Sequence, residues 1–315
     1  MLIQDLHGSL RANIEKRISG KGEVIDRVII AAIAGGHVLL DDLPGTGKTT
    51  LARSMAQSVD GEFRRVQFTP DLLPTDITGV SVYDQKTGEF VFRQGAVFGN
   101  IILADEINRA APRTQSALLE CMEERQVTCD GVTYRLPEPF LVIATQNPVE
   151  LAGTYPLPEA QLDRFMFCLR VGYPERSAEQ EMLCRALKGV HELTSAADRA
   201  YVLAAREELM KIRISDAVQG YLLDIAEATR ADADIRTGLS PRGLIALADA
   251  SRGFAGINGR DYVIPDDVKA VAADVIAHRL ILKGASYGDS LPQKRKAADG
   301  ILRNVTVPKD DLWNC

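Results

Sequence analysis

Residues 45–49, Gly-Thr-Gly-Lys-Thr, have the types and spacing that hold the phosphates of a nucleotide. Glycines let successive backbone N–H groups turn toward one anion, and a following helix presents its positive N-terminal end. Lys48 would add a mobile positive charge for the β- and γ-phosphates, and Thr49 would offer a hydroxyl to Mg²⁺. The residues therefore predict a phosphate-binding loop.

The surroundings of this loop support the prediction, with one departure from the usual pattern. The full pattern G-x-x-x-x-G-K-[ST] has a glycine where Asp42 stands. An apolar run at 38–40 predicts a buried strand before the loop, and apolar periodicity from Thr49 predicts a helix after it. A chance glycine-rich turn is the alternative, and this context disfavours it. The candidate nucleotide-binding residues are Asp42, Leu43, Pro44, Gly45, Thr46, Gly47, Lys48, Thr49 and Thr50.

Two acids, Asp105 and Glu106, end a second apolar run at 101–104. At the carboxyl end of a strand beside a phosphate loop, Asp105 could hold Mg²⁺ together with Thr49. Glu106 could orient and deprotonate an attacking water. A solvated pair of acids is the alternative, and the neighbouring phosphate loop favours the catalytic interpretation.

Three further polar residues are candidates for sensing or stabilising the phosphates. Asn147 follows the next apolar run and could bond the γ-phosphate or the water, although Asn-Pro also simply makes turns. Arg164 could be an arginine finger for a neighbouring subunit, or a surface arginine paired with Asp163 or Glu159. Arg242 opens a helix in the second half of the chain and could contact the phosphates, or could be solvated.

The elements that must position these residues form an α/β half and a helical half. Short, nearly continuous apolar runs that alternate with helices predict a parallel sheet covered on both faces. These runs lie at 38–40, 65–68, 100–106, 140–145 and 166–170. From about Pro174 the pattern indicates helices only. We therefore predict an α/β domain at 1–173, a helical domain at 174–282 and a polar tail at 283–315.

Two stretches inside the α/β half interrupt the pattern: 124–138 predicts a β-hairpin, and 79–97 predicts a second hairpin or a loop insert. Asp130-Gly131 separates two β-rich runs within 124–138, and a polar turn at 86–88 separates two more within 79–97. Ordinary edge hairpins are the alternative to a functional role for these inserts.

Composition limits the class of protein. A net charge of −6 and a pI near 5.4 argue against a generally basic nucleic-acid binder. Five cysteines without a C-x-x-C pair fit reduced thiols in a cytoplasmic protein. The start of the chain is not a signal peptide, and no apolar run approaches the length that spans a membrane.

Taken together, these residues resemble the MoxR family of AAA+ ATPases. The resemblance runs from about residue 4 to 282. It rests on 36–40 (Gly-His-Val-Leu-Leu), 44–49, 105–110 (Asp-Glu-Ile-Asn-Arg-Ala), 115–127, 144–148, 153–165 and 239–242 (Leu-Ser-Pro-Arg). The stretch 153–165, Gly-Thr-Tyr-Pro-Leu-Pro-Glu-Ala-Gln-Leu-Asp-Arg-Phe, is far more specific than any ATP-binding motif.

The resemblance implies a role for each candidate residue. Lys48 and Thr49 correspond to Walker A, Asp105 and Glu106 to Walker B, Asn147 to sensor 1, Arg164 to the arginine finger and Arg242 to sensor 2. The inserts at 79–97 and 124–138 correspond to the helix-2 insert and the pre-sensor-1 hairpin, which face the pore of a ring. Residues 19–22 fit the base-binding pattern of the family less well, so the adenine contacts stay open.

The resemblance also implies a fold and an activity. The expected fold is an AAA+ P-loop NTPase domain, a parallel sheet covered by helices, followed by a smaller all-α lid. The expected activity is Mg²⁺-dependent ATP hydrolysis by a hexameric ring. Family members are chaperone-like, act with von Willebrand A-domain partners and help to mature protein complexes.

Two other functions remain alternatives. A nucleic-acid motor or loader would use the same two inserts to grip DNA, and a basic pore would then be expected. Residues 124–138 carry three acids and two arginines, a net −1, and residues 79–97 carry two acids and two bases, a net zero. This favours a protein client. A nucleotide switch that hardly hydrolyses is disfavoured by the presence of Glu106 and Arg164.

Overall fold

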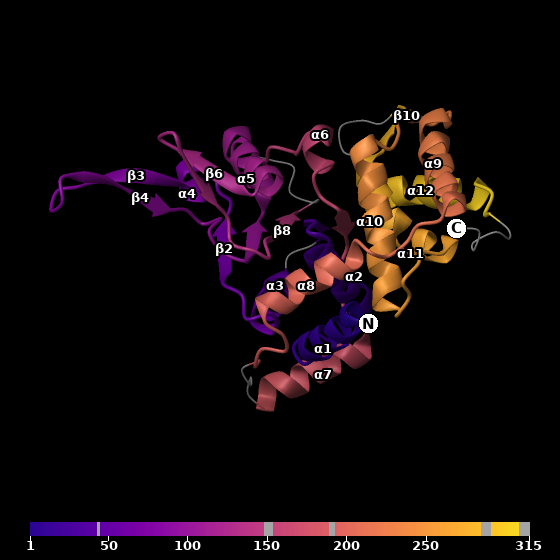
Figure 1. Cartoon of the computed structure of the whole chain (residues 1–315), viewed down its shortest axis with the longest axis horizontal. Helices are drawn as coiled ribbons and strands as arrows, with labels where there is room; N and C mark the ends of the chain where they lie inside the picture. The colour runs from indigo at the N-terminus through magenta and orange to yellow at the C-terminus, as the bar shows by residue number, and fades with distance from the viewer. Residues whose placement is uncertain (43–44, 148–153, 189–192, 285–290, 309–315) are drawn as a thin grey trace.

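The fold is taken from a computed structural model, drawn in Figure 1, which describes residues 1–42, 45–147, 154–188, 193–284 and 291–308. Its centre is a five-stranded sheet in the order β2-β5-β8-β1-β9, in which all neighbouring strands are parallel. The strands are β1 (Val38–Asp41), β2 (Phe63–Gln67), β5 (Ile101–Asp105), β8 (Leu141–Gln146) and β9 (Phe167–Leu169).

Burial on both faces explains why the strands are nearly continuous apolar runs. Side chains alternate between two buried clusters. Val38 and Leu40 of β1 join the cluster that contains α1 (Leu2–Glu15), α2 (Gly22–Ala34) and α3 (Lys48–Ser58). Leu39 joins the cluster on the other face, with α5 (Pro112–Glu124). The predicted parallel sheet covered on both faces is confirmed.

Both inserts form hairpins outside the central sheet. One pairs β3 (Gly79–Asp84) with β4 (Glu89–Gln94) after the short helix α4 (Pro74–Thr78), and the other pairs β6 (Gln126–Cys129) with β7 (Val132–Arg135). Phe92 of β4 stacks on Tyr134 of β7, with ring centroids 4.0 Å apart. In Figure 1 the β3–β4 hairpin projects away from the body of the molecule.

Helices dominate the rest of the chain. They are α6 (Glu159–Leu162), α7 (Arg176–Lys188), α8 (Arg199–Leu209), α9 (Asp216–Ala231), α10 (Pro241–Ile257), α11 (Pro265–Ile276) and α12 (Leu291–Asn304), with the 3₁₀ turns η1 (Ile107–Arg109) and η2 (Ala277–Arg279). Helix α8 packs on α1 and α2, whereas α10 and α11 pack on each other and α12 packs on α11 and α9. Among the described residues, no helix is long and apolar enough to cross a lipid bilayer.

The structure differs from the sequence-based expectation in two places. The helical half also contains a short antiparallel ladder between β10 (Ile235–Thr237) and β11 (Ile281–Leu282). Such short strands carry too few residues to show a period. The stretch expected to be a polar tail contains α12, which buries Ala298 and Ile301. These apolar residues lie three apart on a mostly charged helix, so its apolar stripe is narrow.

Candidate nucleotide site

The phosphate loop lies between β1 and α3, as its sequence predicts. Gly45 and Gly47 adopt φ angles of 82° and 90°, in the left-handed region that glycine tolerates. A Cβ added at either glycine would meet no atom of the described residues within 4 Å, so the space next to both glycines is empty. Helix α3 begins at Lys48, with Thr49 and Thr50 in its first turn. Leu43 and Pro44 lie outside the described residues.

Lys48 lies at the edge of the sheet where the two strand-end acids also lie. Its Nζ donates to the backbone oxygen of Asp42 over 2.8 Å. Burial lowers the pKa of Lys48, and the charges of Asp42, Asp105 and Glu106 act in the opposite direction. The structure therefore brings the lysine and both strand-end acids together at the carboxyl edge of the sheet.

Asp42, which replaces the first glycine of the pattern, has a structural contact of its own. It is buried, and its Oδ2 accepts from the backbone N–H of Gly172 over 2.7 Å. Next to it, Asp41 accepts from the Gln146 side chain over 2.9 Å, and burial raises the pKa of Asp41. Two acids thus tie the start of the phosphate loop to β8 and to the segment after β9.

Asp105 and Glu106 share one hydroxyl. Thr145 Oγ1 donates to Asp105 Oδ1 over 2.7 Å and accepts from the Glu106 backbone N–H over 2.9 Å. Glu106 itself adopts φ 56°, which is uncommon for a residue with a side chain. Strained backbone of this kind gathers at functional sites.

Residues of β2 and η1 hold the two carboxylates. Arg65 Nη2 lies 2.6 Å from Asp105 Oδ2. Gln67 Nε2 donates to Glu106 Oε2 over 2.7 Å, and Arg109 Nη1 lies 3.0 Å from the same oxygen. Sequence analysis missed Arg65, Gln67 and Thr145. The run at 65–68 predicted a strand, but nothing in it indicated the pairing with β5.

Asn147 completes this edge of the sheet. It is buried and directly follows β8, whose Gln146 pairs in register with Asp41 of β1. Among the described residues, no group of three or more His, Cys, Asp or Glu side chains could hold a metal ion. Mg²⁺ usually keeps several waters and takes only one or two protein oxygens beside phosphates. Thr49 and Asp105 fit that demand.

The two predicted phosphate-sensing arginines lie elsewhere, on a common acid. Arg164 Nη2 is 3.1 Å from Glu123 Oε2 in α5, and Arg242 Nη2 donates to Oε1 of the same carboxylate. Arg164 thus pairs with neither Asp163 nor Glu159.

A cavity of about 220 Å³ lies at this point, lined by Gly35, Gly36, His37, Met122, Glu123, Arg125, Arg164 and Arg242. Three guanidinium groups against one carboxylate make it electropositive. Arg125 Nη1 and Arg164 Nε are buried and have no hydrogen-bond partner among the residues that the structure describes. Such a pocket is suited to an anion.

The cavity and the phosphate loop lie at opposite ends of β1. Gly36 and His37 precede the strand, whereas Asp42 and the loop follow it. Met166, two residues after Arg164, donates its backbone N–H to His37 O over 2.8 Å. Strand β1 has four residues, and at 3.3 Å per residue its ends are roughly 13 Å apart. The structure therefore does not bring Arg164 and Arg242 to the loop of their own chain.

Comparison with known proteins identifies the family. A model of the ATPase family associated with various cellular activities (AAA) matches residues 37–167, and a model of the AAA lid domain matches residues 227–299. The chaperone MoxR1 of Mycobacterium tuberculosis is 39% identical over 319 residues, which cover 98% of this chain and 84% of that one. The chain belongs to the MoxR family of AAA+ ATPases.

Two further relatives extend the match over the whole fold. The YeaC protein of Bacillus subtilis is 47% identical over 310 residues, 97% of each chain. The crystal structure of a Cytophaga hutchinsonii protein assigned as an ATPase superposes with a TM-score of 0.88 at 40% identity, and covers 98% of this chain and 96% of that one. The predicted family and the predicted fold, an AAA+ sheet domain followed by a helical lid, are confirmed. The lid model also includes most of α12. A MoxR AAA+ domain binds ATP, and the individual residue roles stay predictions.

Proposed function

We propose that this MoxR protein is a Mg²⁺-dependent ATPase whose active site is completed between neighbouring subunits of a ring. The observation that supports this most is the distance between the two groups of candidate active-site residues. Lys48, Asp105 and Glu106 lie at the carboxyl edge of the sheet, and Arg164 and Arg242 lie together beyond its amino edge. A head-to-tail contact between subunits brings one edge against the other, and such contacts close into rings. A hexamer is the state expected from the family.

The residues divide the chemistry between two subunits. In one subunit the loop amides and Lys48 bind the phosphates, and Thr49 and Asp105 would hold Mg²⁺, which offsets charge on the β- and γ-oxygens. Glu106, oriented by Gln67 and Arg109, takes the proton of the attacking water. Asn147 bonds the water or the γ-phosphate. Arg164 and Arg242 of the next subunit stabilise the charge that develops on the transferred phosphoryl group.

The adenine base would lie near the link between α1 and α2. Lys21 Nζ donates to Tyr173 O over 2.8 Å, one residue from Gly172, which bonds Asp42. The link therefore lies beside the phosphate loop. Ser19 in the link is buried, and its hydroxyl has no hydrogen-bond partner in the described part of the chain. This supports Ile18, Ser19 and Gly20 as the base-binding segment.

A protein client is the substrate that the hairpins favour. The projecting β3–β4 hairpin exposes Val80, Val82, Tyr83, Phe90 and Val91, with Phe90 73% exposed. Its charges cancel, and the stretch 124–138, which contains the second hairpin, has a net charge of −1. Exposed aromatic and aliphatic side chains can bind the apolar side chains of a polypeptide, whereas a pore that moves along DNA needs Lys and Arg to neutralise the phosphates. We therefore propose chaperone-like remodelling of cytoplasmic protein complexes, with a von Willebrand A-domain partner as in the family.

The first experiment measures the ATP hydrolysis rate per subunit, with Mg²⁺, over a wide range of protein concentration. A rate that climbs and then levels off is expected, because isolated subunits lack the neighbour's arginines. A constant rate from a chain that sizes as a monomer at the lowest concentration would reject the shared site.

A second experiment separates the two substrate classes. Single-stranded DNA and an unfolded protein are added separately to the assembled ATPase, and Phe90→Ser provides a hairpin variant. Stimulation by the protein that Phe90→Ser abolishes supports the client proposal. Stimulation by DNA alone would favour the motor or loader.

A further inference from the structure

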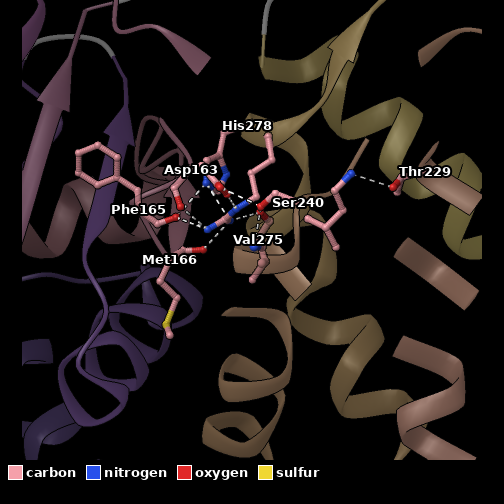
Figure 2. A network of polar contacts seen from close by, with 10 residues as sticks. Asp163, Phe165, Met166, Thr229, Ser240, Val275 and His278 are labelled. Atoms are coloured by element: carbon pink, nitrogen blue, oxygen red, sulfur yellow. Dashed lines mark hydrogen bonds and ion pairs between the residues drawn. The ribbon is translucent and has the colours of Figure 1, made fainter. Parts of the chain in front are cut away.

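A buried arginine in the lid binds the backbone that carries Arg164. Figure 2 shows the network, with Asp163, Phe165 and Met166 labelled among its members. The arginine is Arg279 of η2, whose side chain is 2% exposed. Arg279 Nε donates to Asp163 Oδ1 over 2.7 Å, and Nη2 donates to the backbone oxygens of Asp163 and Phe165 over 3.1 and 2.7 Å. Nη1 donates to the backbone oxygen of Met166 over 3.3 Å, and to that of Val275. One guanidinium therefore holds both sides of Arg164 in the chain.

The same aspartate reaches the start of α10, where Arg242 lies. Ser240 Oγ donates to Asp163 Oδ2 over 2.8 Å and accepts from the Gly243 backbone N–H over 2.9 Å, as the N-cap of α10. Asp163 directly precedes Arg164, and Ser240 lies two residues before Arg242. The Asp163 carboxylate thus joins the finger segment of the ATPase domain to the helix that carries the second arginine.

Close packing fixes the position of Arg279. A Cβ added at Gly243 would lie 2.7 Å from Arg279 Cδ and 2.5 Å from Leu239 Cδ1, so α10 passes directly over the arginine. Burial lowers the pKa of Arg279, and its hydrogen bond to Asp163 opposes that shift. Buried ion pairs add little net stability compared with apolar residues of similar size. A positional role accounts for such a pair better than stability does.

We propose that Arg279 is a positioning residue that holds Arg164 and Arg242 as one rigid unit aimed at the neighbouring subunit's phosphates. This inference rests on the proposed shared site. Arg279 belongs to the lid and most of its acceptors belong to the ATPase domain, so a displacement of the lid would move both arginines together. A shift of about 1 Å in such groups costs on the order of 10²-fold in rate.

The first test compares Arg279→Met and Arg279→Lys with the intact protein. Lysine keeps the charge but cannot form the planar fork that bonds several acceptors at once. In both variants we expect kcat to fall by about 10²-fold, while ATP binding to the variant's own loop stays within about twofold because that loop lies at the other end of β1. A loss of ATP binding equal to the loss of kcat would overturn the proposal.

A matched control measures how much kcat and thermal stability fall when a different arginine of the lid is replaced. Arg260 makes two hydrogen bonds of 2.5 Å to Asp267, which is buried, in the same lid but away from Arg164 and Arg242. Arg260→Met should therefore lower thermal stability while kcat per assembled ring stays near that of the intact protein. An equal fall in kcat for Arg260→Met would show that the effect of Arg279 is general to the lid and would overturn the proposal.

Mixing subunits gives a readout that a merely structural role would not move. Lys48→Ala subunits should not bind ATP at their own loop, but they keep Arg164 and Arg242 in place. Arg279→Met subunits keep an intact loop, but their Arg164 and Arg242 are displaced. In a closed ring of random order, about a quarter of the interfaces then pair an intact loop with intact arginines. Hydrolysis should recover on mixing, as it should for Lys48→Ala mixed with Arg164→Ala. Arg279→Lys takes the place of Arg279→Met if the latter does not assemble.

The outcomes separate the two proposals. Recovery with both partners supports the positioning role. Recovery with Arg164→Ala but not with the Arg279 variant overturns the inference and leaves the shared site standing. Recovery with neither overturns the shared site and the inference with it.

Discussion

At the scale of single residues, the proposed mechanism gives different roles to two adjacent acids, and their surroundings differ accordingly. Asp105 lies on the strand, bonded by Thr145 and Arg65, and is placed to hold a cation. Glu106 leaves the strand at φ 56° and carries its carboxylate toward Gln67 and Arg109. The hydroxyl of Thr145 holds both residues, so a single side chain sets the angle between them.

Glu106→Gln should keep ATP binding and lose turnover, because the amide preserves the shape but cannot take a proton. The expected fall in kcat is about 10²–10⁴-fold. Lys48→Ala is the contrasting variant and should abolish ATP binding itself. Binding of a fluorescent ATP analogue and single-turnover hydrolysis measure the two effects. Equal loss of binding and turnover in Glu106→Gln would reject its role in activating water.

A buried histidine makes stability depend on pH. His37 Nδ1 accepts from the Val142 backbone N–H over 3.0 Å, and Nε2 donates to Met122 O over 3.1 Å. Because an amide N–H can only donate, the folded state requires neutral His37. Burial lowers its pKa to about 3, and the charges of Arg125 and Arg206 act in the same direction.

The free energy of unfolding should therefore fall as the pH drops. The folded pKa lies below the unfolded value of about 6.5, so the contribution is complete above that pH and is lost toward pH 3, by at most about 1.4 kcal/mol per unit. Urea unfolding from about pH 7.5 to 5 measures the slope. His37→Asn should flatten it only in part, because burial also lowers the pKa of His278. An unchanged slope would contradict the assignment.

At the scale of elements, the two edges of one sheet carry different groups of the candidate residues. Parallel strands have all their carboxyl ends at one edge of the sheet, so the residues that follow β1, β5 and β8 lie close together there. The segment before β9 lies at the opposite edge for the same reason, and α5 and the start of α10 meet it there through Glu123. Helix α12 packs on α11 and α9 and so forms part of the lid whose helix α10 carries Arg242.

Ile301→Ala should lower the free energy of unfolding of the lid by about 2–5 kcal/mol, because it leaves a cavity where α12 packs. Ile301 is 5% exposed. Lys296→Ala on the exposed side of the same helix should change it by less than about 0.5 kcal/mol. Denaturant unfolding measures both. Equal, negligible effects would show that residues 291–304 behave as a polar tail and not as part of the lid.

At the scale of the whole molecule, the proposed mechanism makes a single chain an incomplete enzyme, because its loop and its arginines lie on opposite edges of the sheet. Its own Arg164 and Arg242 are neutralised in part by Glu123, and in the proposed ring the phosphates that they would contact belong to another subunit. In that ring, hydrolysis would depend on the contact between subunits.

Arg164→Ala should lower kcat of the assembled ring by about 10³-fold or more, since an arginine finger stabilises charge only in the transition state. ATP binding should be largely kept. Arg213→Ala, which breaks an exposed pair with Asp261, is the control and should leave hydrolysis unchanged. Steady-state hydrolysis at a concentration above assembly measures the difference. Intact turnover in Arg164→Ala would reject the finger assignment.

The sequence by itself determined the features that are local in the chain. The loop at 45–49, the acids after the 101–104 run and the long stretch at 153–165 are contiguous, and strands and helices follow from side-chain periods of two and 3.6. These sufficed for the family, the parallel sheet and the helical lid.

Tertiary structure alone decided which distant residues meet. Arg279 contacts Asp163 from 116 residues away, Arg242 reaches Glu123 from 119, and Thr145 bonds Asp105 from 40. No period or spacing in one sequence encodes such pairs, because they follow from the packing of whole elements. Helix α12 and the β10–β11 ladder were not predicted, for the same reason. Their few apolar residues show no clear period, and only the folded lid shows that they are buried.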